Sequence, residues 1–345
     1  MGLSSYKFCF INNGYRYRIK NTETVIEELK QQIVLFKIKK IFFLDNDIIG
    51  KDINMFKKLL DALILFRKEH EGFEIILAEI ITKGLNADII KRMSLAGFSH
   101  VQIGYESSSD SLLKKISKKN SFASNLLFIK WAKKYSIQVS GLNILRGLLE
   151  ETDSDIRECI DNLHFLRFYR KYMGFNISGL GICFSSKYYQ EIEQTNSLDE
   201  WDVNPQTELL PNSYFAPIDR FKLFFYTKKN YNKLWALYEE IDKYYEAKNY
   251  EYLLISHDKT ICYFEILNNI RIHEIEFNNP IYWEILKECN ASVKSLSNLI
   301  SSLNEKSIKI DNDEITTILL ELRRKHLLYS NSDFSEIITV INTDE

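Results

Sequence analysis

The chain has 345 residues, 45% of them hydrophobic and 27% charged, and its formal net charge is −2 at pH 7. This composition supports a packed core, excludes global disorder and gives no indication of a nucleic-acid partner. No apolar run is long enough to cross a bilayer and the N-terminus lacks the apolar core of a secretion signal, so we expect a cytoplasmic protein with no membrane contact.

The first half of the chain alternates helix-like and strand-like patterns. Thr24 and Glu27 have the spacing of a capping box at the start of one helix. Asn86 is the expected N-cap of another helix, which Gly97 terminates. Helices are predicted over residues 22–37, 52–70, 86–98, 122–136 and 153–169, and strands over residues 40–45, 73–80, 99–107, 137–145 and 174–184. Repeated β-α units with apolar strands predict an α/β fold with a parallel sheet, either a barrel or a doubly wound sheet.

The pattern changes in the second half. Residues 185–218 are polar, carry three of the four prolines and are predicted to form a long loop. A helix is expected over residues 231–247, and residues 250–277 are typical of a β-hairpin. Residues 281–341 are expected to form two or three helices and a final strand, as in a small winged-helix-like unit.

Polar residues follow four successive predicted strands. Ligands of parallel α/β folds bind at the carboxyl ends of the strands, so these residues predict a shared pocket. The alternative is that each one is an independent helix cap or a solvated loop residue. The residues are Asp45 and Asn46, then Glu79, then Gly104, Glu106 and Ser107, then Asn143 and Gly147.

The motifs of the first half, in this order and at this spacing, resemble those of a known enzyme family. They resemble the radical S-adenosylmethionine maturases of ribosomally synthesised peptides, in particular the branch that carries an N-terminal cobalamin-binding-like domain. The resemblance covers roughly residues 6–160. The motifs are "YKFCFINNGYRYRIKN" (6–21), "FLDNDII" (43–49), "ILAEI" (76–80), "VQIGYES" (101–107) and "LNILRGLLEE" (142–151).

The resemblance implies a domain organisation. Residues 1–185 would form a partial (β/α) barrel of the radical S-adenosylmethionine type, without the N-terminal domain of that branch. Residues 186–280 would form a region of loop, helix and hairpin. Residues 281–345 would form the small helical, winged-helix-like unit, so that the whole is an α/β fold with a C-terminal α+β appendage.

The resemblance also implies S-adenosylmethionine as cofactor. Asp45 and Asn46 match the positions that hold the methionine amino group, and Glu106 and Ser107 match those that hold the ribose. The other matched positions of the cofactor pocket are Glu79, Gly104, and Asn143 and Gly147 beside the methionine and adenine.

The cluster motif departs from the family pattern. A radical enzyme of this kind needs a [4Fe–4S] cluster held by three thiolates. Cys9 matches the third of these cysteines, Tyr6 stands at the second, and no cysteine stands at the first. A phenol with a pKa of about 10 replaces a thiolate poorly at neutral pH. We therefore interpret Cys9 as a relic of the metal motif, the alternatives being an iron ligand completed by another chain and an unrelated buried thiol.

These departures leave the enzymatic status open. The favoured interpretation is a cluster-deficient protein of peptide maturation that binds a precursor peptide or supports an active radical enzyme chain. The alternative is an active [4Fe–4S]/S-adenosylmethionine peptide-modifying enzyme completed by another chain. A DNA-binding regulator on a borrowed fold is a third interpretation.

Three further expectations concern single segments. The apolar strand "KIFFLD" (40–45) would stand at an open sheet edge, which predicts self-association or a second chain. The run "KKISKK" (114–119) is typical of a solvated loop. The separated histidines share no metal-ligand spacing and are expected to be structural; they include His100, His164 and His257.

Overall fold

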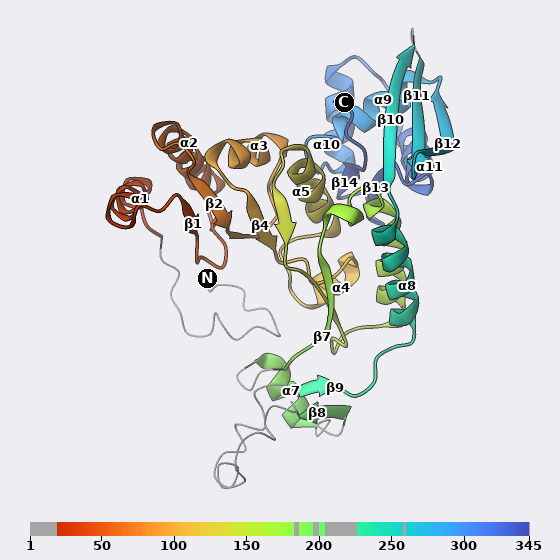
Figure 1. The fold of residues 1–345 in the computed structure, drawn as a ribbon. Helices are drawn as coiled ribbons and strands as arrows, with labels where there is room; N and C mark the ends of the chain where they lie inside the picture. Colours follow the sequence, from red (N-terminus) through yellow and green to blue (C-terminus); the bar gives the residue numbers. More distant parts are fainter. Residues whose placement is uncertain (1–18, 183–185, 196–199, 204–225, 258–259, 345) are drawn as a thin grey trace.

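The computed structural model describes residues 19–182, 186–195, 200–203, 226–257 and 260–344. Parallel strands in chain order form the N-terminal part (Figure 1). Single parallel bridges, Ile75 to Phe98 and Glu106 to Ile144, connect the paired strands into one curved series. The pairs are β1 (Lys40–Phe42) with β2 (Glu74–Leu77), β3 (Glu79–Ile80) with β4 (His100–Ile103), β4 with β5 (Gln138–Ser140), and β6 (Leu142–Arg146) with β7 (Phe175–Gly179).

Two of the predicted strands are each divided into two. The segment 73–80 divides between β2 and β3, and the segment 137–145 divides at Gly141 between β5 and β6. Gly141 has φ +64, and a Cβ there would lie 2.8 Å from the Gln102 side chain, so a glycine is required at this bend. Each half pairs with a different neighbour, which curves the series of strands.

Helices flank the strands. They are α1 (Thr22–Phe36), α2 (Ile53–Glu69), α3 (Ala87–Ala96), α4 (Asp110–Lys115), α5 (Phe122–Lys134) and α6 (Asp153–Leu163), followed by 3₁₀ turns at His164–Leu166 and Arg170–Tyr172. Asn86 caps α3 by accepting from the Ile89 N–H, and Gly97 ends it with φ +100, as predicted. The N-cap of α1 is Asn21, so the predicted Thr24–Glu27 capping box was wrong.

The second half contains more regular structure than predicted. The polar segment 185–218 includes α7 (Lys187–Thr195) and β8 (Trp201–Val203), and β8 pairs antiparallel with β9 (Tyr226–Lys228). The helix α8 (Leu234–Ala247) follows. The predicted hairpin is a three-stranded antiparallel sheet of β10 (Tyr250–His257), β11 (Thr260–Leu267) and β12 (Ile270–Phe277).

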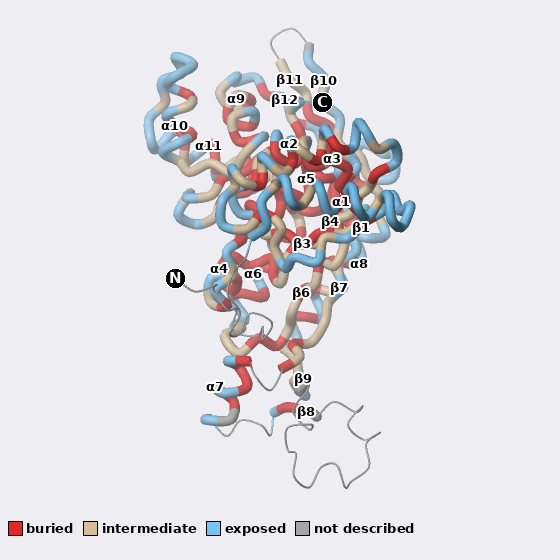
Figure 2. The backbone as a smooth tube through the Cα atoms, turned by 90° about the vertical axis from the view of Figure 1, so that its left-hand side faces the viewer, coloured by how far each residue is buried: buried red, intermediate tan, exposed pale blue. Residues whose placement is uncertain are grey.

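The C-terminal residues form helices and a short antiparallel hairpin, where two or three helices and a single final strand were expected. This C-terminal unit contains α9 (Pro280–Glu288), α10 (Leu296–Glu305), α11 (Asn312–Arg324), β13 (Leu328–Ser330) and β14 (Ile337–Thr339). Figure 2 shows buried stretches running through α3 and α5 and exposed stretches on α1 and α10. No helix of the described residues is long and apolar enough to span a bilayer.

Buried polar contacts join the second half of the chain to the part that carries the parallel strands. Lys130 on α5 donates to the backbone oxygens of Asn290 (2.8 Å) and Thr339 (2.7 Å). Arg167 donates to both carboxylate oxygens of Glu265 on β11, at 3.0 and 2.9 Å. Because the side chains of Lys130, Arg167 and Glu265 are almost fully buried, each needs its partner in place. These contacts fix the C-terminal unit and the β10–β11–β12 sheet on the first half of the chain.

Candidate functional site

The strands present a polar face opposite the face that packs on the helices. In β4, Val101 and Ile103 are buried among the helices, and the alternate residue Gln102 points the other way. Register pairs Glu79 with Gln102, Gln102 with Ser140, and Asn143 with Asn176. We call this row the polar face; its residues are Glu79, Gln102, Ser140, Asn143 and Asn176.

Lys118 lies over the carboxyl end of β4. Its Nζ atom is 2.8 Å from Glu106 Oε1, and its side chain is only 5% exposed. Gly104 makes this approach possible, because a Cβ there would lie 2.8 Å from Lys118 Nζ. The lysine also lies close enough to Glu79 to lower the pKa of that carboxyl, against the larger effect of burial, which raises it. The expectation of a solvated loop at 114–119 was therefore wrong at Lys118.

The loop after β1 is organised by Asp47. Its carboxylate accepts the backbone N–H groups of Ile49 (3.3 Å) and Ile81 (3.2 Å), and burial raises its pKa. The neighbouring Asp45 and Asn46 are exposed. Asp47 thus ties the end of β1 to the end of β3, and sequence reasoning did not single it out.

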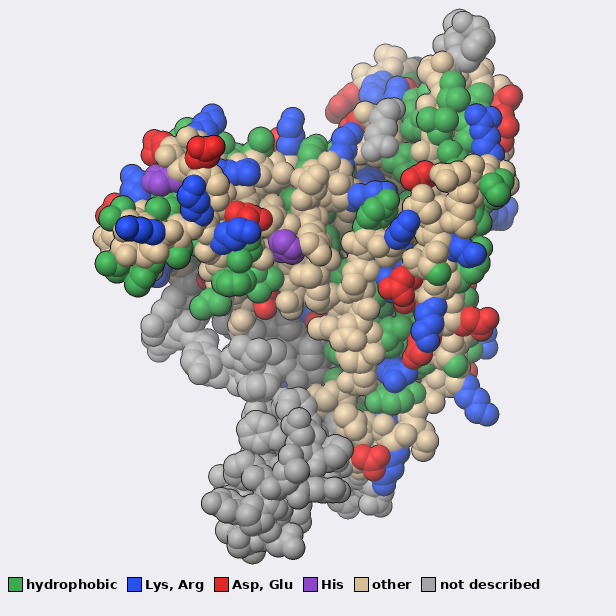
Figure 3. Space-filling model, in the orientation of Figure 1, with side chains coloured by type: hydrophobic (Ala, Val, Ile, Leu, Met, Phe, Trp, Pro, Cys, Tyr) green, Lys and Arg blue, Asp and Glu red, His purple; other side chains and the backbone are tan. Residues whose placement is uncertain are grey.

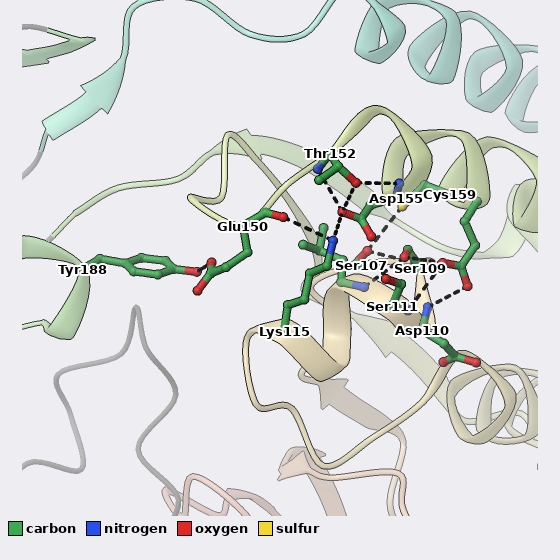
Figure 4. A network of polar contacts seen from close by, with 12 residues as sticks. Ser107, Ser109, Asp110, Ser111, Lys115, Glu150, Thr152, Asp155, Cys159 and Tyr188 are labelled. Carbon is green, nitrogen blue, oxygen red and sulfur yellow. Dashed lines mark hydrogen bonds and ion pairs between the residues drawn. The ribbon is translucent and has the colours of Figure 1, made fainter. Parts of the chain in front are cut away.

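A network of polar contacts holds the loop that follows Glu106 (Figure 4). Ser109 Oγ donates to Glu158 Oε2 at 2.6 Å, and the Asp110 N–H donates to Glu158 Oε1 at 3.0 Å. Ser107 is fully buried, with its Oγ 3.3 Å from the Cys159 sulfur. Burial raises the pKa of Cys159 to about 12, so this thiol is not ionised at neutral pH.

The same network continues into the turn after β6. Lys115 Nζ is 2.6 Å from Asp155 Oδ2, and Tyr188 on α7 donates to Glu150 (Figure 4). Gly147 has φ +81, and its N–H donates to Glu151 Oε2 at 2.9 Å. These contacts fix the turn beside the polar face.

The structure brings together part of the predicted site. Glu79, Gly104 and Glu106 gather around Lys118, and Asn143 lies on the adjacent strand. A parallel bridge pairs Glu106 with Ile144, and Leu145 N donates to Glu106 O at 2.9 Å. These contacts hold the segment after β4 against β6. Ser107 turns into the interior and Gly147 lies in the following turn. The cofactor roles of these residues stay predictions.

The cluster ligand Cys9 lies outside the described residues. Within the described ranges, no group of three or more His, Cys, Asp or Glu side chains is arranged to hold a metal ion. Cys159 and Cys289 are buried and their thiol pKa values are raised to about 12, while Cys262 is half-buried on β11. Cys159 and Cys289 belong to the packed interior. Cys262 belongs to the sheet of β10, β11 and β12, which we call the C-terminal sheet.

Comparison with known proteins identifies the domain. Residues 7–163 match the family model of the radical SAM superfamily, so this part of the chain is a radical SAM superfamily domain. The curated proteins include no match to this chain.

Two solved structures are similar to this chain. OxsB, a cobalamin-dependent S-adenosylmethionine radical enzyme, is 13% identical with a TM-score of 0.51, and the match covers 94% of this chain and 44% of OxsB. TsrM from Kitasatospora setae, a radical S-adenosylmethionine methyltransferase, is 17% identical with a TM-score of 0.48, covering 59% of this chain and 41% of TsrM. The likeness to OxsB shows a shared fold, and this chain spans less than half the length of either protein.

Proposed function

We propose that this chain is a cluster-deficient protein of ribosomal peptide maturation that binds a precursor peptide or supports an active radical enzyme chain. The observation that carries the proposal is the set of sulfur ligands. A cluster that binds S-adenosylmethionine needs three thiolates close together, and the motif supplies only Cys9. Tyr6 stands at the second ligand position.

The remaining cysteines do not compensate for the missing thiolates. Cys159 is buried against Ser107, and Cys289 is buried at the end of α9, where burial raises its thiol pKa to about 12. Cys262 lies in the C-terminal sheet. The donor set therefore does not fit a three-thiolate cluster, and we derive no chemical step through one.

The polar face and the adjoining Glu106 fit part of a cofactor site. Glu79, Glu106 and Asn143 offer carboxylate and amide oxygens suited to amino and hydroxyl groups. Lys118 already neutralises Glu106, so a cationic ligand must compete with an internal ammonium group. This arrangement supports weak binding of S-adenosylmethionine.

Anaerobic reconstitution with iron and sulfide tests the proposal. We expect purified protein to retain far fewer than the roughly four iron atoms per chain of a complete cluster, and to bind S-adenosylmethionine weakly in calorimetry. Near-stoichiometric cluster iron together with reductive cleavage of S-adenosylmethionine would overturn it. The variant Cys9→Ser is the matched control, because any iron bound through the motif should be lost with this thiol.

The alternative, an active enzyme completed by another chain, has one specific observation in its favour. Glu79, Gly104 and Glu106 still gather at the carboxyl ends of adjacent strands. Reconstitution in the presence of a co-purifying chain distinguishes the two proposals. Stoichiometric cluster iron that forms only in the mixture supports the enzyme.

A further inference from the structure

A cleft of about 430 Å³ separates α5 from the C-terminal sheet. One wall is formed by four consecutive residues of β10, Tyr250 to Leu253. Successive strand residues point to opposite faces of a sheet, so a cleft lined by all four runs along the edge of the strand. β10 is an edge strand, since the sheet order is β10-β11-β12 (Figure 1).

The opposite wall is basic. Lys133 and Lys134 of α5 line the cleft, against a single carboxylate from Glu251, while the neighbouring Lys130 is buried and bonded to Asn290 and Thr339. Lys171 extends the basic surface, with its Nζ 3.3 Å from the Asn249 side chain just before β10. Figure 3 shows Lys and Arg side chains around the junction between α5 and the β10–β11–β12 sheet. The charge of the cleft therefore favours an acidic ligand.

Aromatic rings complete the lining and are held in place by the fold. Phe168 stacks edge-to-face on Tyr252, with ring centroids 5.1 Å apart. Tyr252 accepts a hydrogen bond from the Asn342 N–H at 2.9 Å, and the Tyr250 hydroxyl lies 3.2 Å from that of Tyr244. Fixed rings beside an open strand edge provide flat apolar contacts for alternate side chains of an added strand.

We infer that this cleft binds an extended acidic peptide segment, which adds to β10 as a further strand. The inference rests on the proposed peptide-binding role and specifies its surface and ligand. The backbone groups at the edge of β10 would supply affinity, and Lys133 and Lys134 would select acidic side chains. The cleft is lined by four residues of β10, so a segment of about four to six residues is long enough to fill it.

Fluorescence anisotropy with labelled decapeptides tests the inference on the full chain. The probe is alternating Glu-Val. Its controls are alternating Glu-Pro, in which every proline lacks a backbone N–H and disfavours a strand, and alternating Lys-Val. We expect binding of Glu-Val alone. The variant Lys133→Glu/Lys134→Glu should weaken it about tenfold or more. Lys91→Glu, on the exposed surface of α3, is the matched control and should leave it unchanged.

A second measurement uses the unmodified protein, because Lys133 also donates to Phe168 O. Amide hydrogen exchange in residues 250–257 should slow when Glu-Val is added. Glu-Val binding that is unaffected by the double variant and leaves this exchange unchanged would place the peptide elsewhere. That result overturns the inference but leaves a peptide-binding role intact. Absence of Glu-Val binding also overturns it, while the iron measurement judges the proposed function separately.

Discussion

Lys118 connects two carboxylate side chains, Glu79 on β3 and Glu106 just after β4. Its side chain is 5% exposed and that of Glu106 is 15% exposed, so the ion pair is largely shielded from water. We expect Lys118→Met to lower the free energy of unfolding by about 3 kcal/mol, because it leaves a buried carboxylate unpaired. Urea denaturation measures the loss.

Two variants check the assignment of this loss to the ion pair. Lys114→Met, at an exposed position of α4, should change the stability by less than about 0.5 kcal/mol. Adding Glu106→Gln to Lys118→Met should restore part of the stability, since the unpaired charge is then removed. Equal, small losses for Lys114→Met and Lys118→Met would contradict a structural role for the pair.

Lys130 predicts a dependence of stability on pH. Burial lowers its pKa to about 7 from the ordinary 10.5, while Cys289 and Asp344 raise it slightly and Lys134 lowers it. Between these two pKa values the unfolded chain binds more protons at this position than the folded chain. Stability from this group therefore rises with pH above about 7 and is constant below it.

The comparison with Lys130→Met isolates this contribution. From pH 7 to 8.5, the wild type should gain up to about 2 kcal/mol relative to the variant. Urea denaturation of both proteins at each pH measures the difference. A difference independent of pH would show that Lys130 keeps an ordinary pKa in the folded protein.

At the scale of single residues, sequence reasoning found the strand ends but not the groups that organise them. Glu79, Gly104 and Glu106 could be predicted from the sequence because they end apolar strands. Lys118 could not be predicted, because its neighbours in the sequence are typical of a solvated loop and its pairing with Glu106 depends on the fold. Asp47 was missed because a strand pattern cannot tell which of two nearby aspartates turns inward.

At the scale of elements, Gly97 gives a direct test of a helix end. It ends α3 with φ +100, and a Cβ there would lie 3.2 Å from Phe73 O. Gly97→Ala should cost about 1–2 kcal/mol of unfolding free energy, because the left-handed conformation and the close backbone both oppose a side chain. Thermal denaturation measures the loss. Gly174→Ala is the matched control and should be nearly neutral, since no atom lies within 4 Å of its Cβ position.

The elements that sequence predicted well are those with local signals. The ends of α3 follow from Asn86 and Gly97, whose capping bonds involve neighbouring residues only. The third strand of the C-terminal sheet was missed because the turn at Asn268 and Asn269, both with positive φ, interrupts a run of strand-forming residues without proline or glycine. The bend at Gly141 was missed because it depends on Gln102, a partner across the sheet.

At the scale of the whole molecule, the edge at β1 predicts association. Within the described residues β1 pairs with β2 alone, and Phe42 and Leu44 are 57% and 89% exposed. We expect the protein to associate with itself or with a second chain over this edge. Phe42→Lys should weaken association without unfolding, whereas Ile41→Lys should unfold the protein, since Ile41 is buried.

Light scattering across protein concentration measures this association. A monomer at all concentrations, with and without a co-purifying chain and unaltered by Phe42→Lys, would contradict the prediction. Circular dichroism of both variants separates loss of association from loss of folding.

The contacts of α5 have a consequence for the timing of folding. This helix is buried from Phe122 to Ala132, yet Lys130 bonds to Asn290 and Thr339, which lie 160 and 209 residues later in the chain. At about 5–20 residues per second, a ribosome makes Thr339 about 10–40 s after Lys130. During that interval the emerging chain lacks the surface that covers α5. The nascent protein is therefore exposed to aggregation and chaperone capture over α5 until the segment around Thr339 has left the ribosome, and the native burial of Lys130 is completed only then.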